Sequence, residues 1–163
     1  MTLPLTTTLS SCARAATAAE ASYRVDTPLN PARGVRVIAL DPGAAVVTGR
    51  LAVQEWTSAR FFTCSGDAGG VVLQGVGGVP ASLDEQLTEA DVVLLVATED
   101  AGAGCAYAVG RACWERGIMT AGVVVSEGFE AEHAVAALRP HARVLLPTAD
   151  ETDVVELLSA LRA

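Results

Sequence analysis

The sequence predicts a three-layer α/β/α domain built on a mostly parallel sheet, and three observations support this prediction. Short apolar runs typical of buried strands alternate with helix-like segments from residue 35 onward. Parallel strands need such crossover segments, which place helices on both faces of a sheet. The chain of 163 residues is long enough for one domain with a sizeable core.

The first half of the predicted core contains three strands and one helix. A β-branched run at 35–40 ends at Asp41, Pro42 and Gly43, as a strand followed by a turn does. Apolar residues near a helical period follow. The predicted elements are a strand at 35–40, a helix within 44–56, a strand at 59–64 and a short strand within 69–78 between glycine turns.

The second half repeats the alternation of strand and helix. Ser82 followed by Glu85 forms a capping-box pattern at a helix start. Residues 91–98 are almost wholly apolar, as expected of a central parallel strand. We expect a helix over 105–116 closed by Gly117, a strand at 119–126, a helix at 130–139 ended by Pro140, a strand at 142–148 and an amphipathic helix at 150–162.

The first residues differ in pattern from this core. Prolines and a glycine break regular structure at 27–34, and the alanine-rich piece before them offers only a weak apolar face. We therefore expect an N-terminal arm over 1–33 and a single α/β domain over 34–163. Trp56 and Trp114 fall late in two predicted helices, where they are expected to close the core, with an interface as the alternative for Trp114.

Composition excludes several classes of function. The net charge is −8 and the sequence has no lysine, so no Schiff-base, P-loop or protein-kinase lysine is present. The lack of a basic run argues against nucleic acid as a partner, and no apolar run is long enough to span a membrane. The four cysteines form no CxxC pair or zinc spacing, which predicts small, buried, reduced thiols in a cytoplasmic protein.

The predicted fold directs attention to one edge of the sheet. In open α/β sheets, ligands bind beyond the carboxyl ends of the strands. These ends are the loops after Leu40, Cys64, Ala97, Ser126 and Pro147. After Ala97, the sequence TEDAGAGC places two carboxylates before a small-residue loop that opens a helix, where backbone N–H groups can hold an anion. A tight packing turn is the alternative.

The order of these loops resembles the nucleotide-binding domain of the FtsZ/tubulin family. The unit ADVVLLVATEDAGAGCAYAVGRACWERGIMTAGVVVS lies where that family has a strand, a GGGTGTG loop, an alanine-rich helix closing at glycine, and an apolar strand. VRVIALDPGAA, ARFFTCSGD, GVGGVPASLDEQL and RVLLPTAD lie at further family loops. The resemblance covers about residues 35–150 and implies a Rossmann-like sheet that binds GTP or GDP, with Mg²⁺ as an associated cation.

The resemblance also implies a candidate nucleotide site whose loops depart from the family's phosphate-binding motifs. The candidate binding residues are Gly43, Ala44, Asp67, Ala101, Gly102, Ala103, Gly104 and Cys105. Proline in the first loop removes a backbone donor, and the second loop is shorter than in the family. The family's catalytic acidic loop lies beyond the position of Ala163. We therefore expect no catalytic residue and no GTP hydrolysis unless a partner supplies that loop. The expected role is in binding or assembly, with self-association or another FtsZ-like protein as partner.

Several alternatives remain open at this stage. The protein is either a weak purine-nucleotide module or a non-catalytic, dimeric interaction scaffold, with a Rossmann-type dinucleotide enzyme as a further option. Glu99 and Asp100 either bind Mg²⁺ or are solvated. Asp67 either contacts a ribose or ends a strand, and Cys105 is either a helix-activated thiolate or a packing residue. His133 and His141 are expected on the surface, too poorly aligned to share one ligand.

Overall fold

A seven-stranded, mostly parallel sheet forms the centre of the protein, as predicted. The computed structural model describes residues 33–67, 69–125 and 131–163. The strand order is β4-β3-β2-β1-β5-β6-β7. The strands are β1 (Val35–Ala39), β2 (Ala59–Asp67), β3 (Gly70–Gly75), β4 (Pro80–Ala81), β5 (Val92–Ala97), β6 (Met119–Val124) and β7 (Val144–Leu146).

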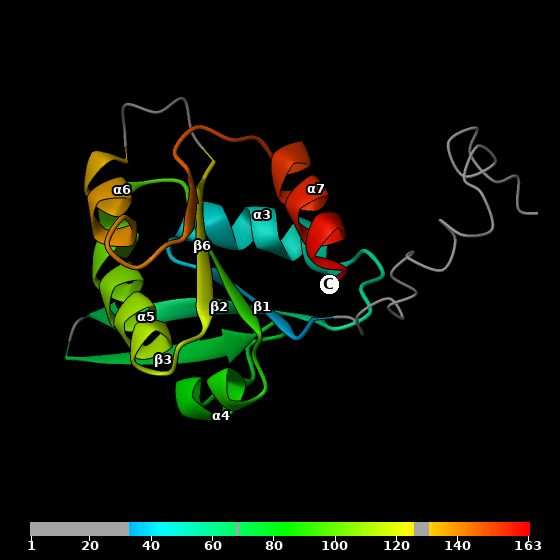
Figure 1. Cartoon of the computed structure of the whole chain (residues 1–163), viewed down its shortest axis with the longest axis horizontal. Helices are drawn as coiled ribbons and strands as arrows, with labels where there is room; N and C mark the ends of the chain where they lie inside the picture. The colour runs from blue at the N-terminus through cyan, green and yellow to red at the C-terminus, as the bar shows by residue number, and fades with distance from the viewer. Residues whose placement is uncertain (1–32, 68, 126–130) are drawn as a thin grey trace, which may run out of the picture. The chain divides into compact units, whose positions relative to one another are not determined.

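Helices cover both faces of the sheet, which gives the three-layer α/β/α architecture (Figure 1). They are α3 (Pro42–Ala52), α4 (Leu83–Thr88), α5 (Ala103–Glu115), α6 (Glu132–Leu138) and α7 (Glu151–Leu161), with a 3₁₀ turn, η1 (Asp100–Gly102), before α5. Figure 1 shows α5 and α6 on one side of the sheet and α3 and α7 on the other.

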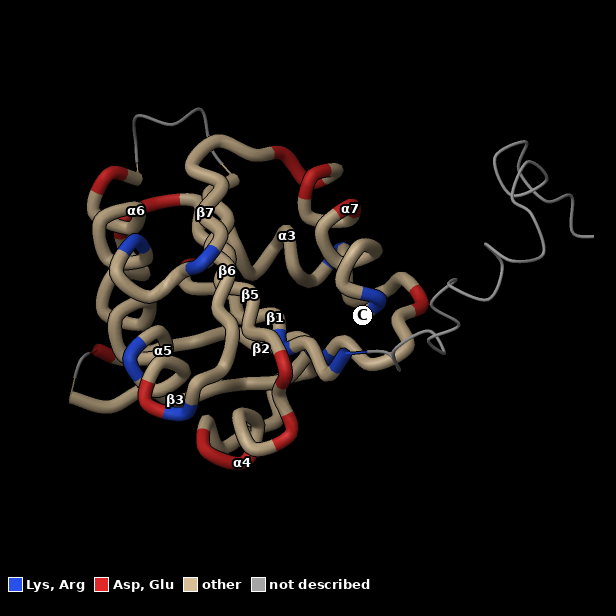
Figure 2. The backbone as a smooth tube through the Cα atoms, in the orientation of Figure 1, with Lys and Arg blue, Asp and Glu red and all other residues tan. Residues whose placement is uncertain are grey.

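Alternation along the central strands divides the core between these two faces. Ile38, Val93 and Leu95 pack with the residues of α5 and α6, whereas Val37 and Leu94 pack toward α3 and α7. Successive side chains of a strand point to opposite faces, so a strand covered on both sides is expected to be largely apolar. Figure 2 shows β5 and β6 without charged residues, whereas β1 carries Arg36, which is 3% exposed.

One part of the sheet departs from the parallel arrangement. β1 pairs in parallel with β2 and β5, and β5–β6 and β6–β7 are also parallel. β2 and β3 are antiparallel, with Asp67 opposite Gly70, because the link between them is too short for a crossover. The β3–β4 pair is also antiparallel.

Three local predictions are wrong. Ser82 stands at the N-cap of α4, but its side chain makes no capping hydrogen bond, so the expected capping box is absent there. Trp114 does not close the core, because it is 72% exposed. His141 is half-buried and its ring meets the Tyr107 ring edge-on at 5.7 Å, so it is not a free surface histidine.

Other expectations are confirmed. α5 ends at Glu115 and Gly117 follows in a left-handed conformation with φ of 69°. Cys64, Cys105 and Cys113 are buried and free of disulfides. Trp56 lies beyond the end of α3 and packs against the core, where its indole N–H donates to the Leu51 carbonyl at 2.9 Å.

Part of the sequence-based organisation stays a prediction. The arm expected over 1–33 lies outside the described residues except for Arg33, whose carbonyl accepts a hydrogen bond from the Ser58 hydroxyl. The loop expected after Ser126 and the start of the helix expected at 130 also lie outside the described residues. No helix among the described residues is long and apolar enough to cross a membrane.

Candidate site at the carboxyl edge of the sheet

A pocket of about 360 Å³ lies at the carboxyl ends of β1 and β2, where the fold predicts a ligand. Residues from the first loop, the β2–β3 hairpin and the start of α5 surround it. Its lining residues are Leu40, Asp41, Pro42, Ala45, Thr63, Cys64, Ser65, Gly66, Gln74, Ala101 and Cys105. Of the predicted binding residues, Ala101 and Cys105 belong to this lining.

Asp41 organises the loop that follows β1. The residue is only 6% exposed and stands at the N-cap of α3. Its Oδ1 atom accepts a hydrogen bond from the Ala44 N–H at 2.8 Å. A capping carboxylate of this kind satisfies a free donor of the first helical turn and interacts favourably with the helix dipole.

The same carboxylate also ties this loop to the segment after β5. Oδ2 accepts from the backbone N–H groups of Thr98 at 2.7 Å and Glu99 at 3.2 Å. The Thr98 hydroxyl donates to Oδ1 at 2.5 Å. The Asp41 carboxylate thus accepts from donors in two segments, the first turn of α3 and the residues after β5. We call this set of hydrogen bonds the Asp41 latch.

Two glycines let these loops approach each other closely. A Cβ atom at Gly43 would lie 2.1 Å from the Thr98 hydroxyl oxygen, and one at Gly102 would lie 2.4 Å from the Leu40 carbonyl oxygen. Real Cβ atoms essentially never approach other atoms this closely. Packing between the two loops therefore explains both glycines without a bound phosphate.

Asp100 has a similar structural role at α6. Its Oδ1 accepts from the backbone N–H groups of His133 at 2.9 Å and Ala134 at 3.0 Å. Its Oδ2 lies 2.9 Å from Nδ1 of His133. The Ala134 N–H and the His133 ring lower the pKa of Asp100, and the Asp100 carboxylate raises the pKa of His133.

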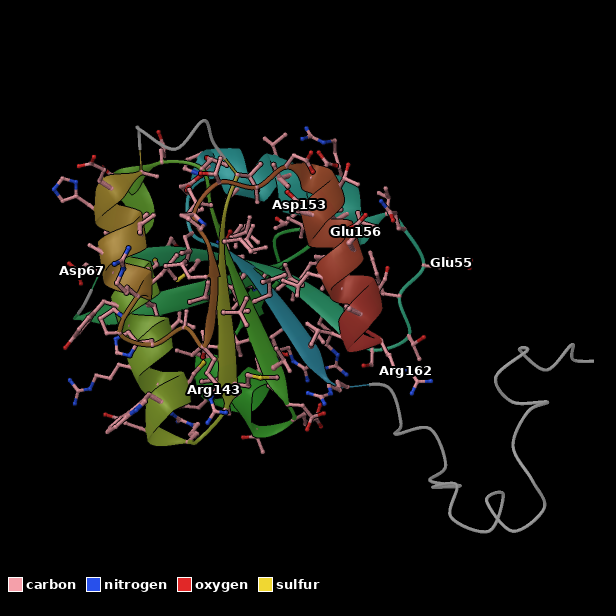
Figure 3. All side chains as sticks on the ribbon, turned by 45° about the horizontal axis from the view of Figure 1, so that its top comes forward. Glu55, Asp67, Arg143, Asp153, Glu156 and Arg162 are labelled. Carbon is pink, nitrogen blue, oxygen red and sulfur yellow. The ribbon has the colours of Figure 1, made fainter. Side chains whose placement is uncertain are left out.

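The remaining predicted site residues do not line the pocket. Gly43 is half-buried and Ala44 is buried, both in the first turn of α3, and Gly102 is buried in η1. Ala103 and Gly104 are half-buried at the start of α5. Figure 3 shows Asp67 at the outer edge on the side of α5 and α6, where its carboxylate accepts from the Gly69 N–H at 2.8 Å.

Sequence reasoning missed two features of the pocket. The sequence predicts Asp41 in a turn after the first strand, whereas it is the N-cap of α3; an acidic residue directly before a helix that begins with proline is itself a capping signal. Cys64 was placed at the end of a strand but not paired with Cys105. Cys64 lies near the carboxyl end of β2 and Cys105 near the start of α5, so both were predicted at the carboxyl edge of the sheet, where they could have been paired.

The pocket lining combines apolar and polar side chains. No group of three or more His, Cys, Asp or Glu side chains gathers at a possible metal site within the described ranges. Scanning the sequence against protein-family models gave no match, and neither did a search of curated proteins. The FtsZ/tubulin resemblance therefore stays a prediction.

Proposed function

We propose that this domain acts in binding or assembly without hydrolysing a nucleotide, and that it binds purine nucleotides weakly or not at all. The Asp41 latch is the observation that carries this proposal. In a nucleotide-binding loop, free N–H groups at a helix start receive the phosphate. Here a carboxylate of the chain itself accepts from those donors.

Charge supports the same proposal. A phosphate beside Asp41 would meet a like charge on a largely buried carboxylate, and like charges at about 4–6 Å repel by an appreciable free energy. The exposed Glu99 side chain adds a further negative charge near the same loop. Neither carboxylate is balanced by a lysine, because the chain has none.

Anion rescue tests whether the Asp41 carboxylate stands where an external anion would bind. In the Asp41→Gly variant the Ala44 and Thr98 N–H groups lose their partner, so sulfate should stabilise this variant more than the wild type. Asp150→Gly is the matched control, since Asp150 caps α7 at the surface by accepting from the Asp153 N–H at 2.9 Å. Equal sulfate responses of the two variants would contradict the proposal.

A phosphate-release assay tests the absence of hydrolysis. We expect the full chain with GTP and Mg²⁺ to release phosphate no faster than buffer does. Phosphate release that scales with protein concentration and disappears in Asp41→Gly would contradict the proposal. It would assign GTP hydrolysis to the carboxyl edge of the sheet.

Self-association is the second candidate, and one face of α5 favours it. Trp114 is 72% exposed and Tyr107, two helical turns away, is 47% exposed. Aromatic side chains of this kind are enriched at protein interfaces. Sedimentation velocity over a range of concentrations tests whether a second copy binds there, with Trp114→Ser expected to weaken association and the exposed Val53→Ser as control.

A further inference from the structure

Two thiols from different elements meet in the carboxyl-edge pocket. Cys64 lies in β2, opposite Leu73 of β3, and Cys105 is the third residue of α5. Both side chains line the pocket of about 360 Å³. The residues are 8% and 3% exposed, so each contributes mainly to the pocket wall rather than to the outer surface.

The surroundings make the two thiols chemically unequal. Hydrogen bonding with Cys64 lowers the pKa of Cys105, while the same contact and burial raise the pKa of Cys64. The Cys105 Sγ also lies 3.6 Å from the Gly66 carbonyl oxygen. Cys105 stands in the first turn of α5, where the helix dipole favours a thiolate, although burial and, to a smaller extent, the Asp67 carboxylate act to raise its pKa.

Cys113 provides an internal comparison. It lies two turns further along α5, is fully buried and does not line the pocket. Burial raises its pKa to about 11. A thiol in that position is protonated at neutral pH and closed to solutes, so it should remain unreactive.

We propose that Cys64 and Cys105 form a dithiol site that reduces small hydroperoxides, with Cys105 as the attacking thiol and Cys64 as the resolving thiol. The pocket admits a molecule of that size between Thr63, Gln74 and the two sulfur atoms. This proposal does not depend on nucleotide binding, because it rests on the two thiols, whereas the proposed function rests on the hydrogen bonds of Asp41.

The reaction balances in two steps. With hydrogen peroxide, the Cys105 thiolate attacks one peroxide oxygen, the O–O bond breaks, and the leaving hydroxide takes a proton to become water, which leaves a sulfenic acid on Cys105. The Cys64 sulfur then attacks the Cys105 sulfur. Its thiol proton leaves with the sulfenic hydroxyl as a second water, and a disulfide forms. Two electrons pass from the sulfur atoms to the peroxide.

The test uses the full chain with Cys12→Ser, which removes the one cysteine outside the described residues. Treatment with hydrogen peroxide should produce a monomer in which non-reducing peptide mapping finds Cys64 linked to Cys105 and Cys113 free. Adding Cys64→Ser should halt the reaction at a sulfenic acid on Cys105, which dimedone traps. Adding Cys105→Ser should slow peroxide consumption by about tenfold or more, because the thiolate is the reacting species.

Cys113→Ser is the matched control and should react like the parent. Far-UV circular dichroism shows whether each variant is folded, and Cys105→Ala provides a second substitution if Cys105→Ser is not. Equal peroxide consumption by the parent and the folded Cys105 variant would overturn the proposal. Dimedone labelling of Cys113, or a parent that forms no Cys64–Cys105 link, would overturn it as well.

Discussion

Removing the Asp41 carboxylate should destabilise the domain far more than removing an ordinary helix cap. Loss of an N-cap side chain costs about 1 kcal/mol. Asp41 also accepts from the N–H and hydroxyl of Thr98, which is half-buried, and an unsatisfied buried donor costs about 1–3 kcal/mol. We therefore expect Asp41→Ala to lower the free energy of unfolding by about 3 kcal/mol.

Asp150→Ala isolates the capping contribution. Its cap contact of 2.9 Å resembles the 2.8 Å contact of Asp41, but Asp150 is exposed. We expect a loss of about 1 kcal/mol there. The difference of about 2 kcal/mol corresponds to about 1 M in the urea midpoint for a slope near 2 kcal/mol/M.

Urea unfolding followed by far-UV circular dichroism measures both variants. The comparison holds if the slope with urea is the same in each protein. Losses that agree within about 0.5 kcal/mol would refute the reasoning, because Asp41 would then act only as a helix cap and would not join the two loops.

Three further predictions concern the same region and its surroundings. Gly43→Ala should destabilise the fold by about 2 kcal/mol or more, because the new methyl group would collide with Thr98. Gly49→Ala, which has open space around it, should stabilise α3 by about 0.5–1 kcal/mol. Thermal unfolding measures the stability of both variants against the wild type. The ion pair of Asp100 and His133 should stabilise the fold fully between pH 3.8 and 6.5, which are the ordinary pKa values of the two groups. This stabilisation should disappear as pH falls through the lowered pKa of Asp100, and also as pH rises through the raised pKa of His133. The free energy of unfolding of Asp100→Asn, measured across this pH range, should lack this dependence. A pH profile equal to that of the wild type would show that the ion pair does not contribute to stability. Trp114→Ser should change the free energy of unfolding by less than about 0.5 kcal/mol, since the side chain is exposed, and a larger loss would place that ring in the core.

The sequence predicted the layers of the fold well, because burial on both faces leaves a direct trace in the residues. The run at 92–97 is wholly apolar and became the central strand β5. The antiparallel β3 was harder to predict, since its direction depends on the short link after Asp67 and not on the strand residues themselves.

The candidate site was less predictable because its residues act through tertiary neighbours. Gly43 and Gly102 resemble a phosphate cradle in sequence, yet the atoms that require them, on Thr98 and Leu40, lie in other loops. Asp100 was weighed as a metal ligand or a solvated charge, whereas it caps a helix more than thirty residues away in the chain. No local pattern contains these partners.

Isothermal titration of GDP into the full chain, with Mg²⁺ and separately with EDTA, measures whether the domain binds a purine nucleotide. We expect no saturable heat that corresponds to a Kd below about 1 mM in either buffer, because Asp41 already accepts from the N–H groups of Ala44, Thr98 and Glu99 and the two loops pack closely together. A saturable titration with a micromolar Kd, strengthened by Mg²⁺, would contradict this expectation.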